Sequence, residues 1–281
     1  MLKKIRALTE QYAIPATFIA YILIDLLLLG LGRLLSSLPK TLPMEYLGEV
    51  ILILVPIAIV FFFGFSRAFK NGNFFRGLYC CLPFLLLQLT ILLIFFSTTL
   101  GDPEANWKPW RLIVFGVFSI IGVGIREECI YRATLQNIVA KKHANSVKGI
   151  WLSAIIGAVI FGVTHISNLF YGMNPIAVLS QVISATTSGL LLGAVYLRSG
   201  SLWALILIHT VTDVAGLAQS TFLRGISDIE EMGQYSISLK FLIVRLIYVG
   251  LAAFLLRPSK CKQIYESLCF ASEESDASAH T

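Results

Sequence analysis

The stretch LIVFGVFSIIGVGIREECIYRATLQNIVA, residues 112–140, decides how this chain can fold. Its first fourteen residues carry no charge, and a second uncharged run, Ala133–Ala140, follows the polar segment Arg126–Arg132. A helix that crosses a lipid bilayer needs about 20 mostly apolar residues, and this stretch is long enough. Because a charged side chain is costly at mid-membrane depth, we expect the charged residues in the polar segment to pair or to take part in chemistry.

The rest of the chain repeats this apolar character. Hydrophobic residues make up 57% of the 281 residues and charged residues only 14%, whereas soluble domains are about half apolar and a quarter charged. The sequence predicts an all-α fold, a polytopic transmembrane bundle that forms one domain over 1–260, followed by a largely disordered cytoplasmic tail at 261–281. We predict eight spans, near residues 14–35, 47–66, 77–99, 111–139, 150–169, 176–197, 202–219 and 240–256.

The net charge of +6 comes from Lys and Arg clusters between the apolar runs. Along the chain, connections that are rich in Lys and Arg alternate with connections that are poor in Lys and Arg. By the positive-inside rule this pattern predicts that both termini are cytoplasmic, and it favours a role in orientation over nucleic-acid binding. The basic connections contain Lys3, Lys4, Arg6, Arg67, Lys70, Arg76, Lys141, Lys142, Lys148, Arg198, Arg257, Lys260 and Lys262.

The spacing of the polar segment gives its two glutamates different roles. Glu128 and Arg132 are four residues apart with the acid first, which favours an ion pair on one helix face. Glu127 is rotated by about 100° from that face and cannot easily share the arginine. Glu127 is therefore the carboxylate that remains available as a general base.

Two histidines lie in other predicted spans. His165 ends the segment FGVTH, residues 161–165, and His209 begins HTVTD, residues 209–213. Because His209 and Asp213 are four residues apart, Asp213 can accept an imidazole N–H and orient the ring. Two histidines and a pair of carboxylates on separate spans favour a functional site over isolated core residues. Straight spans would place Glu127 about 24 Å from the outer end of its helix, and His165 and His209 only about 8 and 14 Å.

These three segments match the pattern EExxxR, FxxxH and HxxxN or HxxxD, in that order on three apolar helices. The pattern resembles the CPBP family, the CAAX-protease and bacteriocin-processing membrane proteins, also called the ABI family, and among them the type II CAAX prenyl endopeptidases. The resemblance covers about residues 110–216. It implies a multi-pass protein of the bacterial plasma membrane that hydrolyses a peptide bond within the membrane, acting on a prenylated protein or a peptide.

The resemblance also implies roles for the motif residues. Glu127 and His165 would activate water, while His209 and Asp213 would stabilise the oxyanion and Arg132 would hold Glu128. Many members have asparagine at the last position, so an aspartate here can donate only if it is protonated. Asp213 would then orient His209, and His209 would donate the hydrogen bond.

Two further questions stay open on the sequence. Glu127, His165 and His209 would make a three-ligand catalytic zinc site with one open position, as in a metalloprotease, but the same groups suffice without a metal. The chain is also compatible with a non-proteolytic membrane protein that confers bacteriocin self-immunity or regulates a membrane partner. A small proton-coupled transporter is a weaker alternative, because no inverted repeat is evident.

Overall fold

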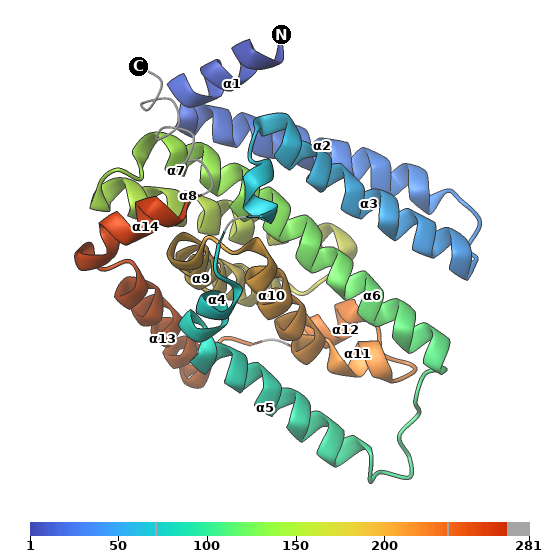
Figure 1. Ribbon diagram of the computed structural model, residues 1–281. Helices are drawn as coiled ribbons and strands as arrows, with labels where there is room; N and C mark the ends of the chain where they lie inside the picture. Colours follow the sequence, from blue (N-terminus) through green and yellow to red (C-terminus); the bar gives the residue numbers. More distant parts are fainter. Residues whose placement is uncertain (71, 235, 269–281) are drawn as a thin grey trace.

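The computed structural model describes residues 1–70, 72–234 and 236–268 (Figure 1). Every regular element in these ranges is helical, and the only pairing of the β type there is an isolated bridge between Trp107 and Leu223. The predicted all-α fold is therefore confirmed. Helices are the expected solution for an apolar chain, because they satisfy every backbone hydrogen bond within one segment.

Each of the eight predicted apolar segments is helical, although several are broken into consecutive elements. In chain order the elements are α1 (Leu2–Gln11), α2 (Ala13–Ser36), α3 (Leu42–Phe63), η1 (Ser66–Phe69), α4 (Phe74–Cys80), α5 (Leu82–Thr99), α6 (Trp110–Glu127), η2 (Glu128–Gln136), α7 (Asn137–His143), α8 (Val147–Thr164), η3 (His165–Tyr171), α9 (Pro175–Ser199), α10 (Leu202–Gly216), α11 (Ala218–Phe222), α12 (Asp228–Gly233), α13 (Leu239–Leu255), η4 (Pro258–Lys260) and α14 (Cys261–Ser267).

The number of helices that can cross a membrane is smaller than eight by length and composition. Five described helices qualify, namely α2, α3, α5, α8 with η3, and α9, and the bent pair formed by α13 and the segment after it would be a sixth. The helices of the other two predicted spans, α6 and α10, do not meet the requirements of length and low charge for crossing a membrane. α6 contains Arg111, Arg126 and Glu127 within its 18 residues, and α10 has only 15 residues. The predicted count of eight is not confirmed.

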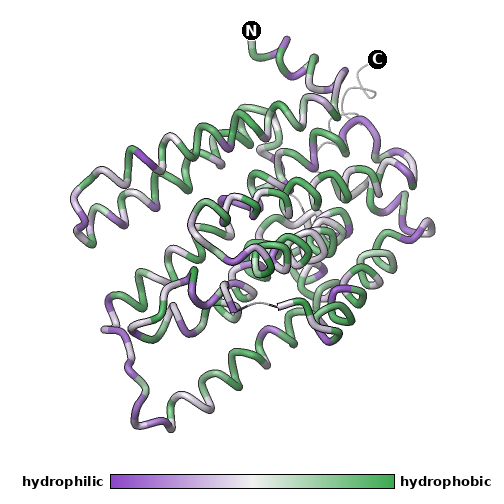
Figure 2. Tube along the Cα trace, turned by 180° about the vertical axis from the view of Figure 1, so that it is seen from behind, coloured by the Kyte–Doolittle hydropathy of each residue, from purple (hydrophilic) through white to green (hydrophobic). Residues whose placement is uncertain are grey.

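The buried core lies where η2, α9 and α10 meet. Every residue of η2 is buried, and so is the whole second half of α9 from Leu191 to Ser199. In contrast, only 11% of the apolar window of α3 and of α5 is buried. These outer helices carry many exposed large apolar side chains, and most of their length is green in Figure 2. Exposed apolar faces of this extent are expected for helices in contact with lipid.

Small residues let the central helices approach closely. A Cβ atom at Gly189 would lie 2.8 Å from the Phe161 ring, and one at Gly193 would lie 2.9 Å from Gln136 Oε1. Gln136 Nε2 donates to the backbone carbonyl of Gly193 at 3.0 Å, so the contact is also polar. The absence of a Cβ therefore lets α9 pack directly on α8 and η2.

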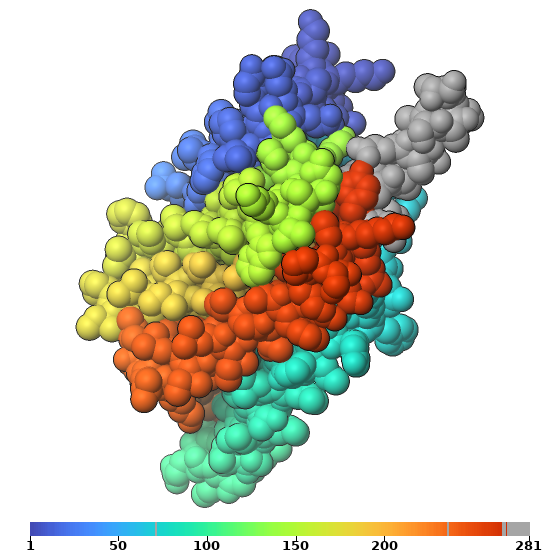
Figure 3. Space-filling view, turned by 90° about the vertical axis from the view of Figure 1, so that its left-hand side faces the viewer, coloured from blue at the N-terminus to red at the C-terminus, as the bar shows by residue number. Residues whose placement is uncertain are grey.

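The first residues of the predicted C-terminal tail are helical. Residues 261–267 of the predicted tail form α14, which packs against α9 and buries Ile264. The start of the predicted tail is therefore a helix that forms part of the bundle. The rest of that tail, residues 269–281, lies outside the described residues. Figure 3 shows α13, in orange, between the yellow α8–α9 region and the teal α5.

Candidate active site

The first motif lies where the helix changes type. α6 ends at Glu127 and the chain continues as the π-helix η2, in which Thr134 Oγ1 donates to the carbonyl of Cys129, five residues earlier. π-helical turns are uncommon and are often found at functional sites. The two glutamates on either side of this change of helix type differ in their exposure to solvent. The side chain of Glu128 is fully buried, whereas that of Glu127 is 27% exposed.

The predicted pair between Glu128 and Arg132 is present. Arg132 Nε lies 3.3 Å from Glu128 Oε2, and both side chains are fully buried. The Arg132 guanidinium also lies over the ring of Phe161, 5.0 Å from its centroid. The counter-charge and the aromatic ring near this buried arginine therefore both come from the motifs themselves.

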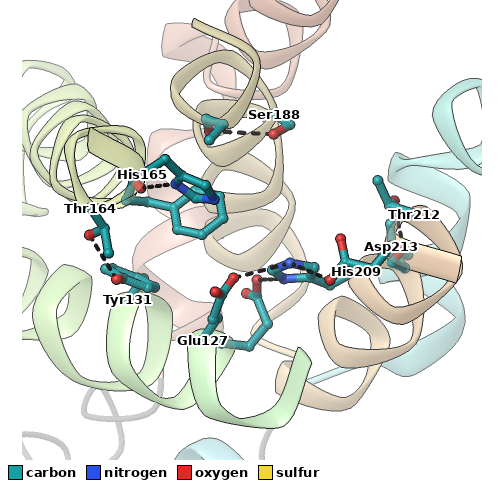
Figure 4. A network of polar contacts seen from close by, with 12 residues as sticks. Glu127, Tyr131, Thr164, His165, Ser188, His209, Thr212 and Asp213 are labelled. Atoms are coloured by element: carbon teal, nitrogen blue, oxygen red, sulfur yellow. Dashed lines mark hydrogen bonds and ion pairs between the residues drawn. The ribbon is translucent and has the colours of Figure 1, made fainter. Parts of the chain in front are cut away.

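The imidazole ring of His209 on α10 contacts three carboxylates. Its Nδ1 lies 2.7 Å from Glu128 Oε1, while its Nε2 lies 3.3 Å from Glu127 Oε2 and 3.4 Å from Asp213 Oδ2 (Figure 4). The predicted contact between His209 and Asp213 is therefore present. The sequence did not indicate that Glu128 would take the other ring nitrogen. Because both nitrogens face carboxylate oxygens, the arrangement fits a ring that donates from both sides.

Close packing between α6 and α10 makes these contacts possible. A Cβ atom at Gly124 would lie 2.9 Å from Thr210 Oγ1 and 3.4 Å from the carbonyl of Ile206. Gly124 stands one turn before Glu128, and Thr210 follows His209 directly. Glycine at this position therefore brings the histidine within hydrogen-bonding distance of the first motif.

His165 enters the site from another direction. It follows the last residue of α8, and its Nδ1 lies 3.0 Å from the carbonyl oxygen of Phe161. A carbonyl only accepts hydrogen bonds, so Nδ1 carries the hydrogen and Nε2 of a neutral ring keeps its lone pair. The Phe161 ring makes edge contacts with both histidines, 5.2 Å from the centroid of His165 and 5.8 Å from that of His209. His165 is also near enough to act electrostatically on Glu127.

A hydroxyl contact ties the second motif to the first. Tyr131 Oη and Thr164 Oγ1 are 2.9 Å apart, and Thr164 immediately precedes His165 (Figure 4). The ring of Tyr131 also packs on Phe161, with centroids 4.9 Å apart. These contacts join η2 to the end of α8, so the position of His165 depends on residues that the motif pattern leaves unspecified.

Glu49 on α3 is a neighbour of the site that sequence reasoning missed. Its Oε2 lies 2.6 Å from Arg126 Nη1, and Ser119 Oγ donates to its Oε1 at 2.9 Å. Arg126 is adjacent to Glu127 in the chain. An acidic residue inside an apolar run could have indicated this neighbour in the sequence. Glu49, however, lies near the start of the predicted span 47–66, where a charged residue is expected at the membrane surface.

The arrangement does not fit a metal centre. Within the described part of the chain, no three His, Cys, Asp or Glu side chains are placed to hold a metal ion. In the zinc set predicted from Glu127, His165 and His209, both ring nitrogens of His209 already face carboxylates. The residue types match a zinc site but their geometry does not, and we derive no step through a metal.

Comparison with known proteins identifies the segment that builds the site. Residues 109–215 match the profile of the family described as type II CAAX prenyl endopeptidase Rce1-like. No curated protein and no solved structure gives a significant match to the chain. The matched segment contains all three motifs and every residue that was predicted to act in them. Residues 109–215, which build the site, are therefore similar to the Rce1-like type II CAAX prenyl endopeptidases, a protease family.

Proposed function

We propose that this protein is an intramembrane endopeptidase that hydrolyses a peptide bond of a lipidated or membrane-associated substrate, and that it resides in a bacterial plasma membrane. The observation that carries the proposal is the position of Glu127. Its carboxylate is partly exposed, lies outside the Glu128–Arg132 pair and contacts His209 beside His165. A carboxylate that contacts one imidazole and has a second near enough to act on it electrostatically has the composition of a water-activating site.

In this proposal Glu127 and His165 activate the water. The water donates one hydrogen bond to the Glu127 carboxylate and the other to His165 Nε2, the ring nitrogen with a free lone pair. As the water oxygen attacks the carbonyl carbon, Glu127 takes its proton. Glu127 then returns this proton to the nitrogen of the leaving amine while the carbon–nitrogen bond breaks, so the carboxylate is regenerated.

His209 would stabilise the negative charge that develops on the carbonyl oxygen. Glu128 accepts the hydrogen of Nδ1, which fixes the ring and leaves the Nε2–H directed toward the space between Glu127 and Asp213. A substrate carbonyl oxygen that enters this space can accept the hydrogen bond. Asp213 acts here as an orienting acceptor, because an ionised aspartate cannot donate as an asparagine would.

The substrate class follows from the family description and from the setting of the site. A CAAX prenyl endopeptidase acts near a lipidated C-terminus, and the site in this chain lies among apolar helices. We propose a prenylated peptide or protein as the substrate, with membrane-associated peptide precursors as the alternative for the same chemistry.

The test compares purified wild type with Glu127→Gln on a panel of prenylated peptides and peptide precursors, each with and without a chelator. We expect cleavage by the wild type and a rate lower by about 10²–10⁴-fold in the variant, the usual contribution of a general base. Glu104→Gln, in the α5–α6 connection, is the matched control. Loss of activity with chelator, restored by zinc, would instead support the metal-dependent form of the site.

The same pair of proteins tests the non-proteolytic alternative. If Glu127→Gln has normal membrane abundance and supports the same immunity or regulatory phenotype as the wild type, the catalytic proposal is wrong.

A further inference from the structure

Three arginines outside the candidate active site gather around the end of α9. Arg198 lies in the last turn of α9, Arg76 lies on α4, and Arg257 follows α13. α4, α13 and α14 all pack against α9, which brings these residues together from distant parts of the chain (Figure 1). A Cβ atom at Gly77 would lie 2.5 Å from Ala204 Cβ, so α4 is pressed closely against this region.

Two of these guanidinium groups have a buried nitrogen without a hydrogen-bond partner. Arg198 is only 7% exposed, and its Nη1 donates to Gln263 Oε1 at 2.8 Å. Its Nε is buried with no hydrogen-bond partner, and so is Nη2 of Arg76. Leaving a buried charged donor unpaired is among the more costly defects in a folded protein.

The cluster lacks a counter-charge among the described side chains. None of the Asp or Glu residues described there forms an ion pair with Arg76, Arg198 or Arg257. Arg76 and Arg257 both act on Arg198 as repelling charges. Like charges held close together repel, so an anion bound between these side chains would stabilise the cluster.

The surface around the cluster is apolar and aromatic. Phe75 is 80% exposed and Tyr79 is 76% exposed, and both are on α4 beside Arg76. The Arg257 guanidinium lies 4.0 Å from the ring centroid of Phe254, which is itself 61% exposed. Exposed aromatic rings next to basic side chains are typical of the level of the lipid headgroups.

We propose that Arg76, Arg198 and Arg257 form a binding site for the phosphate of an anionic phospholipid, at the end of α9 and apart from the candidate active site. The planar guanidinium matches phosphate oxygens with paired hydrogen bonds, and unsatisfied donors on two arginines would supply them. The exposed aromatic rings would contact the acyl chains of the same lipid. Basic sites between helices at the end that carries the Lys- and Arg-rich connections suit such headgroups.

The experiment measures thermal unfolding of the full-length protein in a neutral detergent with added short-chain lipid. Dioctanoyl phosphatidylglycerol is compared with dioctanoyl phosphatidylcholine and with inorganic phosphate. The variants are Arg76→Gln, Arg198→Lys, which keeps the buried charge, and Arg33→Gln, a control arginine in the last turn of α2. A chain that ends at Leu268 tests whether Glu273, Glu274 and Asp276 of the C-terminus supply the anion instead.

We expect phosphatidylglycerol to raise the unfolding temperature and phosphatidylcholine to leave it unchanged. The apparent Kd for phosphatidylglycerol should rise at least tenfold in Arg76→Gln and in Arg198→Lys, but not in Arg33→Gln. The proposal fails if both lipids act equally, or if Arg33→Gln weakens binding as much as Arg76→Gln. An equal effect of inorganic phosphate would overturn the lipid assignment, and lipid binding that appears only in the shortened chain would show that the C-terminus occupies the site.

Discussion

Glu127 and Glu128 are adjacent in the chain, yet they meet different surroundings. Glu128 is fully buried between Arg132 and His209, and its two oxygens contact one partner each. Glu127 is partly exposed and contacts only the Nε2 side of His209. The helical rotation between neighbouring residues explains why one glutamate is enclosed and the other is partly exposed. The motif residues alone predicted this difference, but not the second partner of Glu128.

At the residue scale, the ion pair between Glu49 and Arg126 predicts a positioning effect on Glu127. In Glu49→Gln, Arg126 loses its partner and stands unpaired next to the proposed base. We expect kcat to fall roughly tenfold with little change in KM, because small displacements of a reacting group lower the rate more than the binding. Steady-state kinetics on the substrate that the wild type cleaves would measure both constants.

Two variants make this prediction specific. Glu45→Gln changes an exposed glutamate one turn earlier on α3 and should leave both constants unchanged. The double variant Glu49→Gln with Arg126→Gln removes both charges and should recover part of the lost kcat. If the double variant is no better than Glu49→Gln, the ion pair does not position Glu127.

At the scale of the elements, both of the first two motifs lie at a change of helix type. Glu128 opens the π-helix η2, and His165 opens the 3₁₀-helix η3 after α8 has ended. Straight spans would place Glu127 and His209 at different depths, whereas His209 Nε2 lies 3.3 Å from Glu127 Oε2. A change of helix type alters the rise and the direction of the side chains, so residues at such breaks can converge when regular helices would separate them.

Packing between α8 and α9 gives a prediction at the same scale. A Cβ atom at Gly162 would overlap Thr186 Oγ1 and lie 3.0 Å from the carbonyl of Val182, so alanine requires Thr186 to shift or the two helices to move apart. We expect Gly162→Ala to lower the free energy of unfolding by about 1–3 kcal/mol, as overpacking usually does. Activity should also fall, because His165 is three residues away. Thermal unfolding in detergent measures the first effect.

Gly250→Ala in α13 is the matched control. No atom lies within 4 Å of a Cβ at Gly250, so alanine there should leave the unfolding temperature unchanged or raise it slightly. Adding Thr186→Ala to Gly162→Ala should restore part of the stability, since it removes the nearest clash. Equal stability of Gly162→Ala and the wild type would contradict the close approach of the two helices.

At the scale of the whole molecule, the bundle is apolar on the outside and polar at its centre. Only 11% of the apolar window of α3 and of α5 is buried, while the buried ionised groups collect where η2 and α10 meet. This distribution suits a protein whose outer solvent is lipid, because charged side chains then avoid the surface and pair inside.

The charge pattern predicts the topology of this bundle. In a variant with its five cysteines changed to serine, single cysteines at Lys40 and Glu104 should react with an impermeant maleimide in intact cells. A cysteine at Lys148 should react only after the membrane is permeabilised, because basic connections remain in the cytoplasm. Labelling of Lys148→Cys in intact cells would contradict the predicted orientation and the even number of spans.

The sequence by itself determined the all-helical membrane fold, the three motif segments and the pairing of Glu128 with Arg132. These features depend on apolar length and on spacing within one helix, which are local properties. Only the tertiary structure decided that His209 lies between three carboxylates, that Glu49 supports Arg126 and that Arg76 approaches Arg198. These contacts join residues that are far apart in the chain, and the close approach of helices at glycines such as Gly124 and Gly77 governs them.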